Sequence, residues 1–184
     1  MDAFSCAACP RRCGALRKPA QPSGGFCGMP AGFVVARAAL HQWEEPCISG
    51  QHGSGTVFFS GCSLRCVYCQ NQQISLGRYG ALVTEENLLR MFDRLIEQGA
   101  HNLNLVNPTH YAPMLAKALK KYCSPVPVIY NSGGYERVEM LKALEGLVDI
   151  YLPDLKYVDS AVSLRYSGAA DYFDYASKAI LEMS

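Results

Sequence analysis

Three cysteines in the middle of the chain have the spacing of an iron–sulfur ligand set. Cys62, Cys66 and Cys69 form a CxxxCxxC motif directly after an apolar run at residues 57–59. Soft thiolates suit the iron of iron–sulfur clusters, so this loop can bind three corners of a [4Fe–4S] cube. The fourth iron then lacks a protein ligand, and a metal with an open site can hold a reacting molecule. A structural zinc knuckle is the alternative, although zinc sites are usually closed by four ligands.

A second group of cysteines lies near the N-terminus and comprises Cys6, Cys9, Cys13 and Cys27. Four soft ligands this close in sequence can close a metal site. Glycines next to Cys13 and Cys27 permit tight turns, and the sequence between these two cysteines has the composition of a loop. We therefore expect residues 1–32 to contain little regular structure. They would hold an auxiliary iron–sulfur cluster, a structural zinc ion or reduced thiols without metal.

The composition is that of a globular protein with one sizeable core. The 184 residues are 49% hydrophobic and 18% charged, and the net charge is +1 from 17 basic and 16 acidic residues. This balance gives no basic excess for nucleic acid, and we find no apolar stretch long enough to span a bilayer. The start of the chain lacks the features of a signal peptide. Nine cysteines without a secretion signal favour metal over disulfides, so we expect a cytoplasmic protein.

Residues 33–184 are predicted to alternate between strands and helices. Strands are expected at residues 33–40, 56–60, 102–106, 126–130 and 148–152, and helical periodicity marks residues 84–99, 111–122, 138–144 and 172–183. Strand–helix alternation implies parallel βαβ units with right-handed crossovers. The sequence therefore predicts an α/β fold with about four βα units from residue 56 onward.

Polar or glycine-rich stretches follow each expected parallel strand. They are the cysteine loop and residues 107–110, 131–135 and 153–157. Ordinary turn chemistry explains any one of them. Parallel sheets of this kind bind ligands at the carboxyl ends of their strands. Four such stretches at one end of a sheet, beside three cysteines, therefore favour a cofactor cleft.

A histidine, the single tryptophan and two carboxylates fall together between the first two strands. One interpretation places Glu44 or Glu45 near the cluster or the substrate. We favour a packed Trp43 beside solvated glutamates, with no role for His41 and with Cys47 as a buried thiol.

The CxxxCxxC motif, with Tyr68 directly before its last cysteine, resembles the radical S-adenosylmethionine (SAM) superfamily. The longer string over residues 59–71 resembles the glycyl-radical-enzyme activases, and most closely the pyruvate formate-lyase-activating-enzyme-like iron–sulfur proteins. The resemblance runs from about Cys6 to the end of the chain. It implies a partial (β/α) TIM-like barrel in residues 33–184, preceded by a cysteine-rich metal-binding segment in residues 1–32. Because the family usually has six βα units, either the chain is a truncated N-terminal part, which we favour, or a partner closes the site.

The resemblance also implies how SAM is held. Its amino and carboxylate groups would chelate the open iron. The family commonly carries a Gly-Gly-Glu type stretch after the second strand, which helps to hold the amino group. Here that position reads Asn107-Pro108-Thr109. The oxygens of Asn107 and Thr109 can accept hydrogen bonds from an ammonium group in place of the missing acid.

Further positions match cofactor-binding positions of the family. Asn131 and Ser132 match the site that contacts the ribose or the carboxylate, and Tyr68 matches the aromatic residue near adenine. The activases have an Asp-x-Lys pattern similar to Asp154 and Lys156. Lys156 would pair with the methionyl carboxylate. An ion pair between Asp154 and Lys156 at the barrel rim is the alternative.

The chemistry implied by the resemblance is a one-electron reaction. A reduced [4Fe–4S] cluster passes an electron to SAM, which breaks into methionine and a 5′-deoxyadenosyl radical, and the radical takes a hydrogen atom from the substrate. No side chain need act as acid or base. The expected partners are SAM, an electron donor such as flavodoxin or ferredoxin, and a glycyl radical enzyme as the protein substrate. The alternative is a non-catalytic iron–sulfur or zinc-binding module for electron transfer or assembly.

Overall fold

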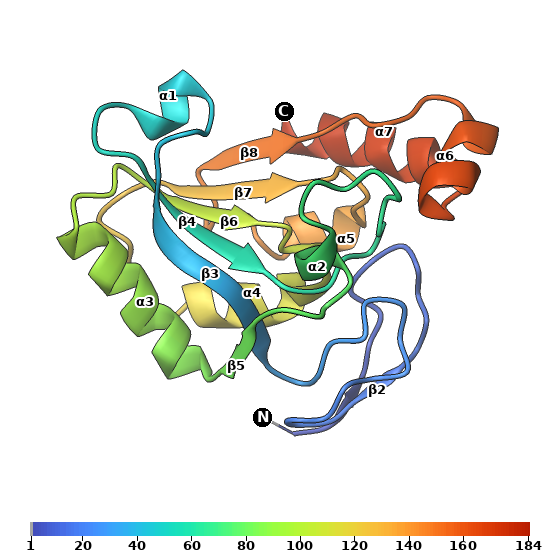
Figure 1. Ribbon diagram of the computed structural model, residues 1–184, viewed down its shortest axis with the longest axis horizontal. Coiled ribbons are helices and arrows are strands. Elements are labelled where there is room, and N and C mark those ends of the chain that lie inside the picture. Colours follow the sequence, from blue (N-terminus) through green and yellow to red (C-terminus); the bar gives the residue numbers. More distant parts are fainter. Residues whose placement is uncertain (1) are drawn as a thin grey trace.

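A six-stranded sheet organises the computed structural model, which describes residues 2–184 (Figure 1). The strand order is β5-β3-β4-β6-β7-β8. The strands are β3 (Phe33–His41), β4 (Ser54–Phe59), β5 (Ala81–Val83), β6 (Leu103–Val106), β7 (Val128–Ser132) and β8 (Ile150–Pro153). Strands β4, β6, β7 and β8 are parallel, whereas β3 runs antiparallel to both β4 and β5. These parallel strands confirm the predicted α/β fold with about four βα units.

Helices lie in the connections between the strands and after the last strand. They are α1 (Pro46–Ser49), α2 (Gln72–Ser75), α3 (Glu85–Glu97), the 3-10 helix η1 (Thr109–Tyr111), α4 (Ala112–Leu119), α5 (Val138–Lys142), α6 (Ser160–Ser167) and α7 (Tyr172–Met183). Helix α3 begins where the Thr84 side chain accepts a hydrogen bond from the Asn87 amide, which caps the helix. All four predicted helical regions contain a helix. Our sequence analysis missed α1, α2, α6 and strand β5.

The two faces of the sheet have different surroundings because strand side chains alternate. Val57 and Leu105 are fully buried in the main hydrophobic core, which includes buried residues of α3 and α4. Their strand neighbours Phe58 and Val106 instead line a cleft. The alternation therefore gives the sheet one packed face and one face available to a ligand.

Strand β7 begins and ends two residues later than the sequence predicted. Pro127 has no N–H for the ladder, and its carbonyl accepts a hydrogen bond from the Leu103 amide over 2.9 Å just before the strand begins. Asn131 pairs with Val106, and Ser132 pairs with Pro153. Both cofactor-binding candidates in this region thus belong to the end of the strand, where pairing fixes their positions.

The N-terminal segment, residues 2–32, lies outside the main sheet, on the side to which the parallel strands point (blue in Figure 1). Its only named strands are β1 (Phe4–Ser5) and β2 (Leu16–Arg17), which pair with each other. This agrees with the expected lack of regular structure.

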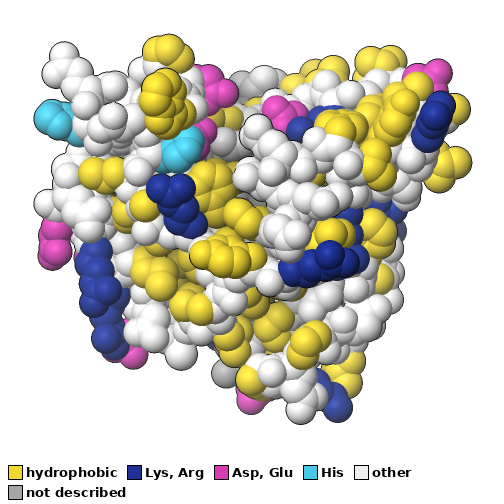
Figure 2. Space-filling model, in the orientation of Figure 1, with side chains coloured by type: hydrophobic (Ala, Val, Ile, Leu, Met, Phe, Trp, Pro, Cys, Tyr) yellow, Lys and Arg dark blue, Asp and Glu magenta, His cyan; other side chains and the backbone are white. Residues whose placement is uncertain are grey.

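The surface and the helices add two observations about possible partners. Basic and acidic side chains both occur on the face shown in Figure 2, among hydrophobic and uncharged ones. Within residues 2–184, no helix combines the length and hydrophobicity needed to cross a membrane.

Candidate functional site

A cleft of about 840 Å³ brings most of the predicted site residues together. Those that line it are Cys62, Cys66, Cys69, Tyr68, Asn107, Asn131, Ser132, Asp154 and Lys156. They come from the loops and strand ends that follow β4, β6, β7 and β8. Of the residues predicted to bind the main cluster or SAM, the cleft leaves out only Thr109.

The cysteine loop is held firmly at its start. The Ser60 carbonyl at the end of β4 lies 2.8 Å from His110 Nε2 and accepts a hydrogen bond from the Tyr111 hydroxyl over 3.3 Å. Gly61 follows with φ +78°, and a Cβ there would lie 2.6 Å from Met29 Cγ. Glycine is therefore required at this position, both for the backbone turn and for the close approach of the N-terminal segment.

Hydrogen-bond donors point at the sulfurs of the loop. The Leu64 amide donates to Cys62 Sγ over 3.3 Å, and the Ser167 hydroxyl donates to Cys66 Sγ over 2.9 Å. Burial raises the pKa of the Cys62 thiol, while backbone hydrogen bonds from Arg65 and Leu64 lower it. Donors of this kind stabilise thiolates and tune iron–sulfur clusters.

The three thiols of the loop line one cleft, and a zinc ion and a cluster would make different demands on them. Nowhere in the described chain do three His, Cys, Asp or Glu side chains form a group that could hold one metal ion. Zinc draws all its sulfur ligands to about 2.3 Å from one point. A [4Fe–4S] cube binds each thiolate at a different iron, so its ligands lie farther apart. Three thiols around one cleft are a ligand set that three irons of a [4Fe–4S] cube can use.

Asn107 adopts an unusual conformation at the end of β6. Its φ is +60°, which asparagine tolerates better than most residues. Its amide N–H donates to the Asn131 carbonyl over 2.8 Å, and its side-chain Nδ2 donates to the Gly61 carbonyl. These contacts tie three strand ends together. They also leave Oδ1 as the side-chain atom that can accept a hydrogen bond from a ligand.

Thr109 does not line the cleft and is buried beneath its surface. Its side chain is buried, and its hydroxyl donates to Oε1 of Glu136. Glu136 is fully buried and also accepts a hydrogen bond from the Tyr130 hydroxyl over 3.2 Å. Burial raises the pKa of Glu136 to about 7, although hydrogen bonds from Thr109, Ser132 and Tyr130 lower it. The sequence analysis missed this carboxyl group, whose only signal was its place directly after the Gly133–Tyr135 turn.

Asp154 and Lys156 form an ion pair on the cleft wall, with Nζ 2.5 Å from Oδ2. Burial by itself lowers the pKa of Lys156, but the Asp154 carboxylate outweighs it and the pKa is raised. The ion pair expected as the alternative therefore forms. Because Lys156 still lines the cleft, the pair does not prevent its ammonium group from meeting a ligand carboxylate.

A buried tyrosine that our sequence analysis did not single out holds this wall in place. The Tyr172 hydroxyl accepts a hydrogen bond from the Lys156 amide over 2.8 Å. It lies 2.8 Å from the Gly133 carbonyl and 2.9 Å from the Asp154 carbonyl, either of which can accept its proton. One side chain on α7 thus joins the loops that follow β7 and β8.

Tyr68 takes part in a chain of hydroxyl groups that leads back to the cysteines. Its hydroxyl lies 2.6 Å from that of Tyr157, which lies 2.6 Å from Ser167 Oγ, the donor to Cys66. The ring of Tyr68 is 56% exposed and lines the cleft. It is therefore fixed at its hydroxyl end while part of its surface remains free to stack on a ligand.

The expectation of a packed Trp43 is wrong. Trp43 is 89% exposed because it follows the end of β3, in the connection to α1, where no element covers the indole. Glu44 is largely buried instead, and its carboxylate lies 3.3 Å from His41 Nδ1. All three side chains line the same cleft. Cys47, expected to be a buried thiol, is exposed on α1.

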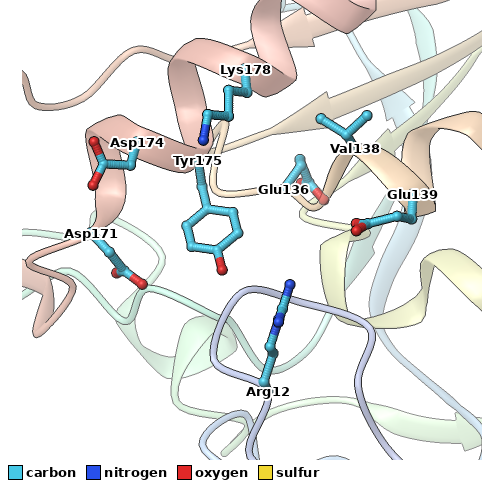
Figure 3. A pocket seen from close by; sticks show the side chains of 8 residues that line it. All are labelled: Arg12, Glu136, Val138, Glu139, Asp171, Asp174, Tyr175 and Lys178. Atoms are coloured by element: carbon cyan, nitrogen blue, oxygen red, sulfur yellow. The ribbon is translucent and has the colours of Figure 1, made fainter.

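A second cavity of about 420 Å³ lies between the N-terminal segment, α5 and α7 (Figure 3). Its charged side chains include Arg12 from the N-terminal segment and Asp174 and Lys178 from α7. Figure 3 shows Arg12 reaching from its loop toward Glu139 and Tyr175. None of the residues predicted to bind metal or SAM lines this cavity, so it is separate from the cysteine cleft.

Comparisons with known proteins agree with the geometry of the cleft. The family model described as the radical SAM superfamily matches residues 56–182, which include the cysteine loop and all four parallel strand ends. The chain is also 30% identical to an uncharacterized protein, MJ0674, of Methanocaldococcus jannaschii, over 92% of this chain and 51% of that protein. The chain thus spans about half the length of this curated relative.

Proposed function

Because the chain belongs to the radical SAM superfamily, we propose that it binds a [4Fe–4S] cluster through Cys62, Cys66 and Cys69 and cleaves SAM reductively. The observation that carries this proposal is the single cleft shared by the three cysteines and the polar strand ends. When bound, the cluster supplies the electron that breaks a carbon–sulfur bond of SAM, which yields methionine and a 5′-deoxyadenosyl radical for hydrogen abstraction.

The chain's own residues would bind and orient SAM. The ammonium group of Lys156 would pair with the methionyl carboxylate, and Oδ1 of Asn107 would accept from the amino group, since both residues line the cleft. Asn131 and Ser132 offer hydrogen bonds to the ribose or the carboxylate. The exposed ring of Tyr68 offers a surface for adenine. Thr109 has no direct role in this arrangement because its side chain is buried and does not line the cleft.

The finer parts of the proposal rest on the resemblance to the glycyl-radical-enzyme activases. The hydrogen atom would come from a glycine of a partner enzyme, and the electron from flavodoxin or ferredoxin. A cluster of low potential operates in a reducing compartment, so we place the protein in the cytoplasm.

The first test is EPR spectroscopy of the anaerobically reconstituted, dithionite-reduced chain, recorded with and without SAM. We expect a [4Fe–4S]⁺ spectrum that changes when SAM binds, and methionine and 5′-deoxyadenosine among the products. The Cys62→Ala/Cys66→Ala/Cys69→Ala variant should lose the SAM-sensitive spectrum and both products. A wild-type cluster spectrum indifferent to SAM would instead indicate a non-catalytic iron–sulfur module.

A second experiment separates SAM cleavage from glycyl-radical activation. The reduced protein and SAM are incubated with pyruvate formate-lyase labelled with α-deuterated glycine. Transfer of deuterium to 5′-deoxyadenosine, together with a glycyl-radical EPR signal, is the expected result. Formation of 5′-deoxyadenosine without deuterium would leave SAM cleavage intact and would rule out this protein substrate.

A further inference from the structure

The four N-terminal cysteines lie together in the folded protein. Cys6, Cys9 and Cys27 are buried, and Cys13 lies at the surface. Cys9 interacts electrostatically with the other three thiols, and Cys27 interacts with those of Cys6 and Cys13. The close approach of Cys13 to Gly25 supports this proximity, because Cys13 Sγ lies 3.0 Å from where a Cβ on Gly25 would be. The four thiols therefore lie in one region of the N-terminal segment.

A buried arginine beside these cysteines lacks a counter-charge. Arg17 is 1% exposed, and its Nη2 donates to Cys27 Sγ over 3.3 Å. No hydrogen-bond partner for its Nη1 occurs among the described residues, and the ion pairs found there do not include it. Its guanidinium lies 5.9 Å from the ring centre of Phe4 and 5.8 Å from that of Tyr111. Aromatic faces give only part of the compensation that a buried charge needs.

We propose that Cys6, Cys9, Cys13 and Cys27 hold a second iron–sulfur cluster, and that this cluster is the counter-charge of Arg17. Four thiolates on a [4Fe–4S]²⁺ core carry a net charge of about −2, which a single adjacent guanidinium offsets in part. Four cysteines leave no open iron, so this second centre cannot ligate SAM.

The second centre would sit close to the first. Arg11, between Cys9 and Cys13, donates from Nε to the Ser63 carbonyl over 2.8 Å. The Cys27 carbonyl lies 3.0 Å from where a Cβ on Gly61 would be. Both cysteine groups are therefore on segments that contact each other directly. This inference does not depend on the first cluster's ability to cleave SAM.

Iron analysis and EPR spectroscopy of the reconstituted chain test the inference. The Cys62→Ala/Cys66→Ala/Cys69→Ala variant removes the first site and should retain about four irons per chain, the content of one cube. Its reduced EPR spectrum should not change with SAM. The Cys9→Ala/Cys27→Ala variant should lose these irons from the wild-type total. Cys47→Ala and Cys123→Ala, which alter exposed cysteines outside both groups, should leave the iron content unchanged.

Arg17 provides a test that leaves all ligands in place. Arg17→Met removes the charge at similar volume, so the second cluster should be harder to reduce and its reduction potential should become more negative. Arg17→Lys should shift it less. The inference is overturned if the triple variant holds no iron or a stoichiometric zinc ion instead. An unchanged potential in Arg17→Met would overturn the role of Arg17.

Discussion

The hydroxyl group of Ser167 donates a hydrogen bond to the sulfur of Cys66 over 2.9 Å, across 101 residues of sequence. Ser167 is the last residue of α6, and it is buried together with Cys66. The same hydroxyl lies 2.6 Å from that of Tyr157. A helix that the sequence did not reveal therefore sets the environment of a proposed cluster ligand.

Replacing Ser167 should change the reduction potential of the cluster. A hydrogen bond to a thiolate stabilises the extra negative charge of the reduced state. Ser167→Ala should therefore make the potential more negative, as measured by an EPR-monitored redox titration. Ser163→Ala is the matched control, because the Ser163 hydroxyl donates to the Ser160 carbonyl on the same helix. Equal potentials in wild type and Ser167→Ala would contradict the prediction.

Removing the hydroxyl of Tyr172 should loosen the cleft wall. Tyr172→Phe leaves the Lys156 amide without its acceptor and removes the proton that the Gly133 or the Asp154 carbonyl accepts. Unsatisfied buried groups cost about 1–3 kcal/mol, so the melting temperature and the affinity for SAM should both fall. Calorimetry measures both quantities. Tyr175→Phe, one turn further along α7, serves as the control, and a similar loss of SAM affinity there would argue against a specific role for Tyr172.

Lys156 should contribute charge to SAM binding. Lys156→Met keeps most of the side-chain length but removes the ammonium group. Charge-assisted hydrogen bonds contribute about 1.5–3 kcal/mol, so we expect affinity for SAM to fall roughly tenfold to a hundredfold in a titration of the reconstituted protein. Lys156→Arg should retain more of the affinity. If Lys156→Met binds SAM as tightly as wild type, then Lys156 serves only as the partner of Asp154.

Glu136 should make stability depend on pH. Its pKa is raised from 4.5 to about 7 in the folded protein, chiefly by burial, so the folded state holds this proton more tightly than the unfolded state. This difference in proton binding stabilises the folded state fully below about pH 4.5. The stabilisation, up to about 3 kcal/mol of unfolding free energy, is lost as pH rises through about 7. Glu136→Gln cannot lose a proton. Its stability relative to wild type should therefore rise from pH 5 to pH 8 in urea unfolding of the anaerobic protein.

A buried histidine, His110, also makes the stability of the protein depend on pH. The effect of Glu136 must therefore be measured as the difference in stability between Glu136→Gln and wild type. Burial lowers the pKa of His110 to about 3, so His110 destabilises the folded state as pH falls below about 6.5. This effect is present in both proteins and cancels in their difference. Parallel pH profiles for wild type and Glu136→Gln would show that Glu136 does not take up a proton in this range.

The sequence by itself determined the elements whose signals are local. The spacing of Cys62, Cys66 and Cys69, the Thr84 cap and the apolar period of α3 depend on residues close together in the chain. Strand–helix alternation then predicted the parallel sheet, since only crossover connections join such strands. That sheet in turn put the polar strand ends at one edge, where the cleft lies.

Only the tertiary structure decided which of these candidates line the cleft and which side chains hold them in position. Thr109 and Asn107 are two residues apart, yet one is turned to a buried carboxyl group and the other to the cleft. Ser167 contacts Cys66, and Arg17 contacts Cys27. No periodicity or motif in the sequence indicates that these positions pair. The physical reason is that the position of a buried hydroxyl or guanidinium depends on the packing of many residues that are distant in sequence. Helix caps, hydrophobic periodicity and ligand spacing depend only on a few neighbouring residues.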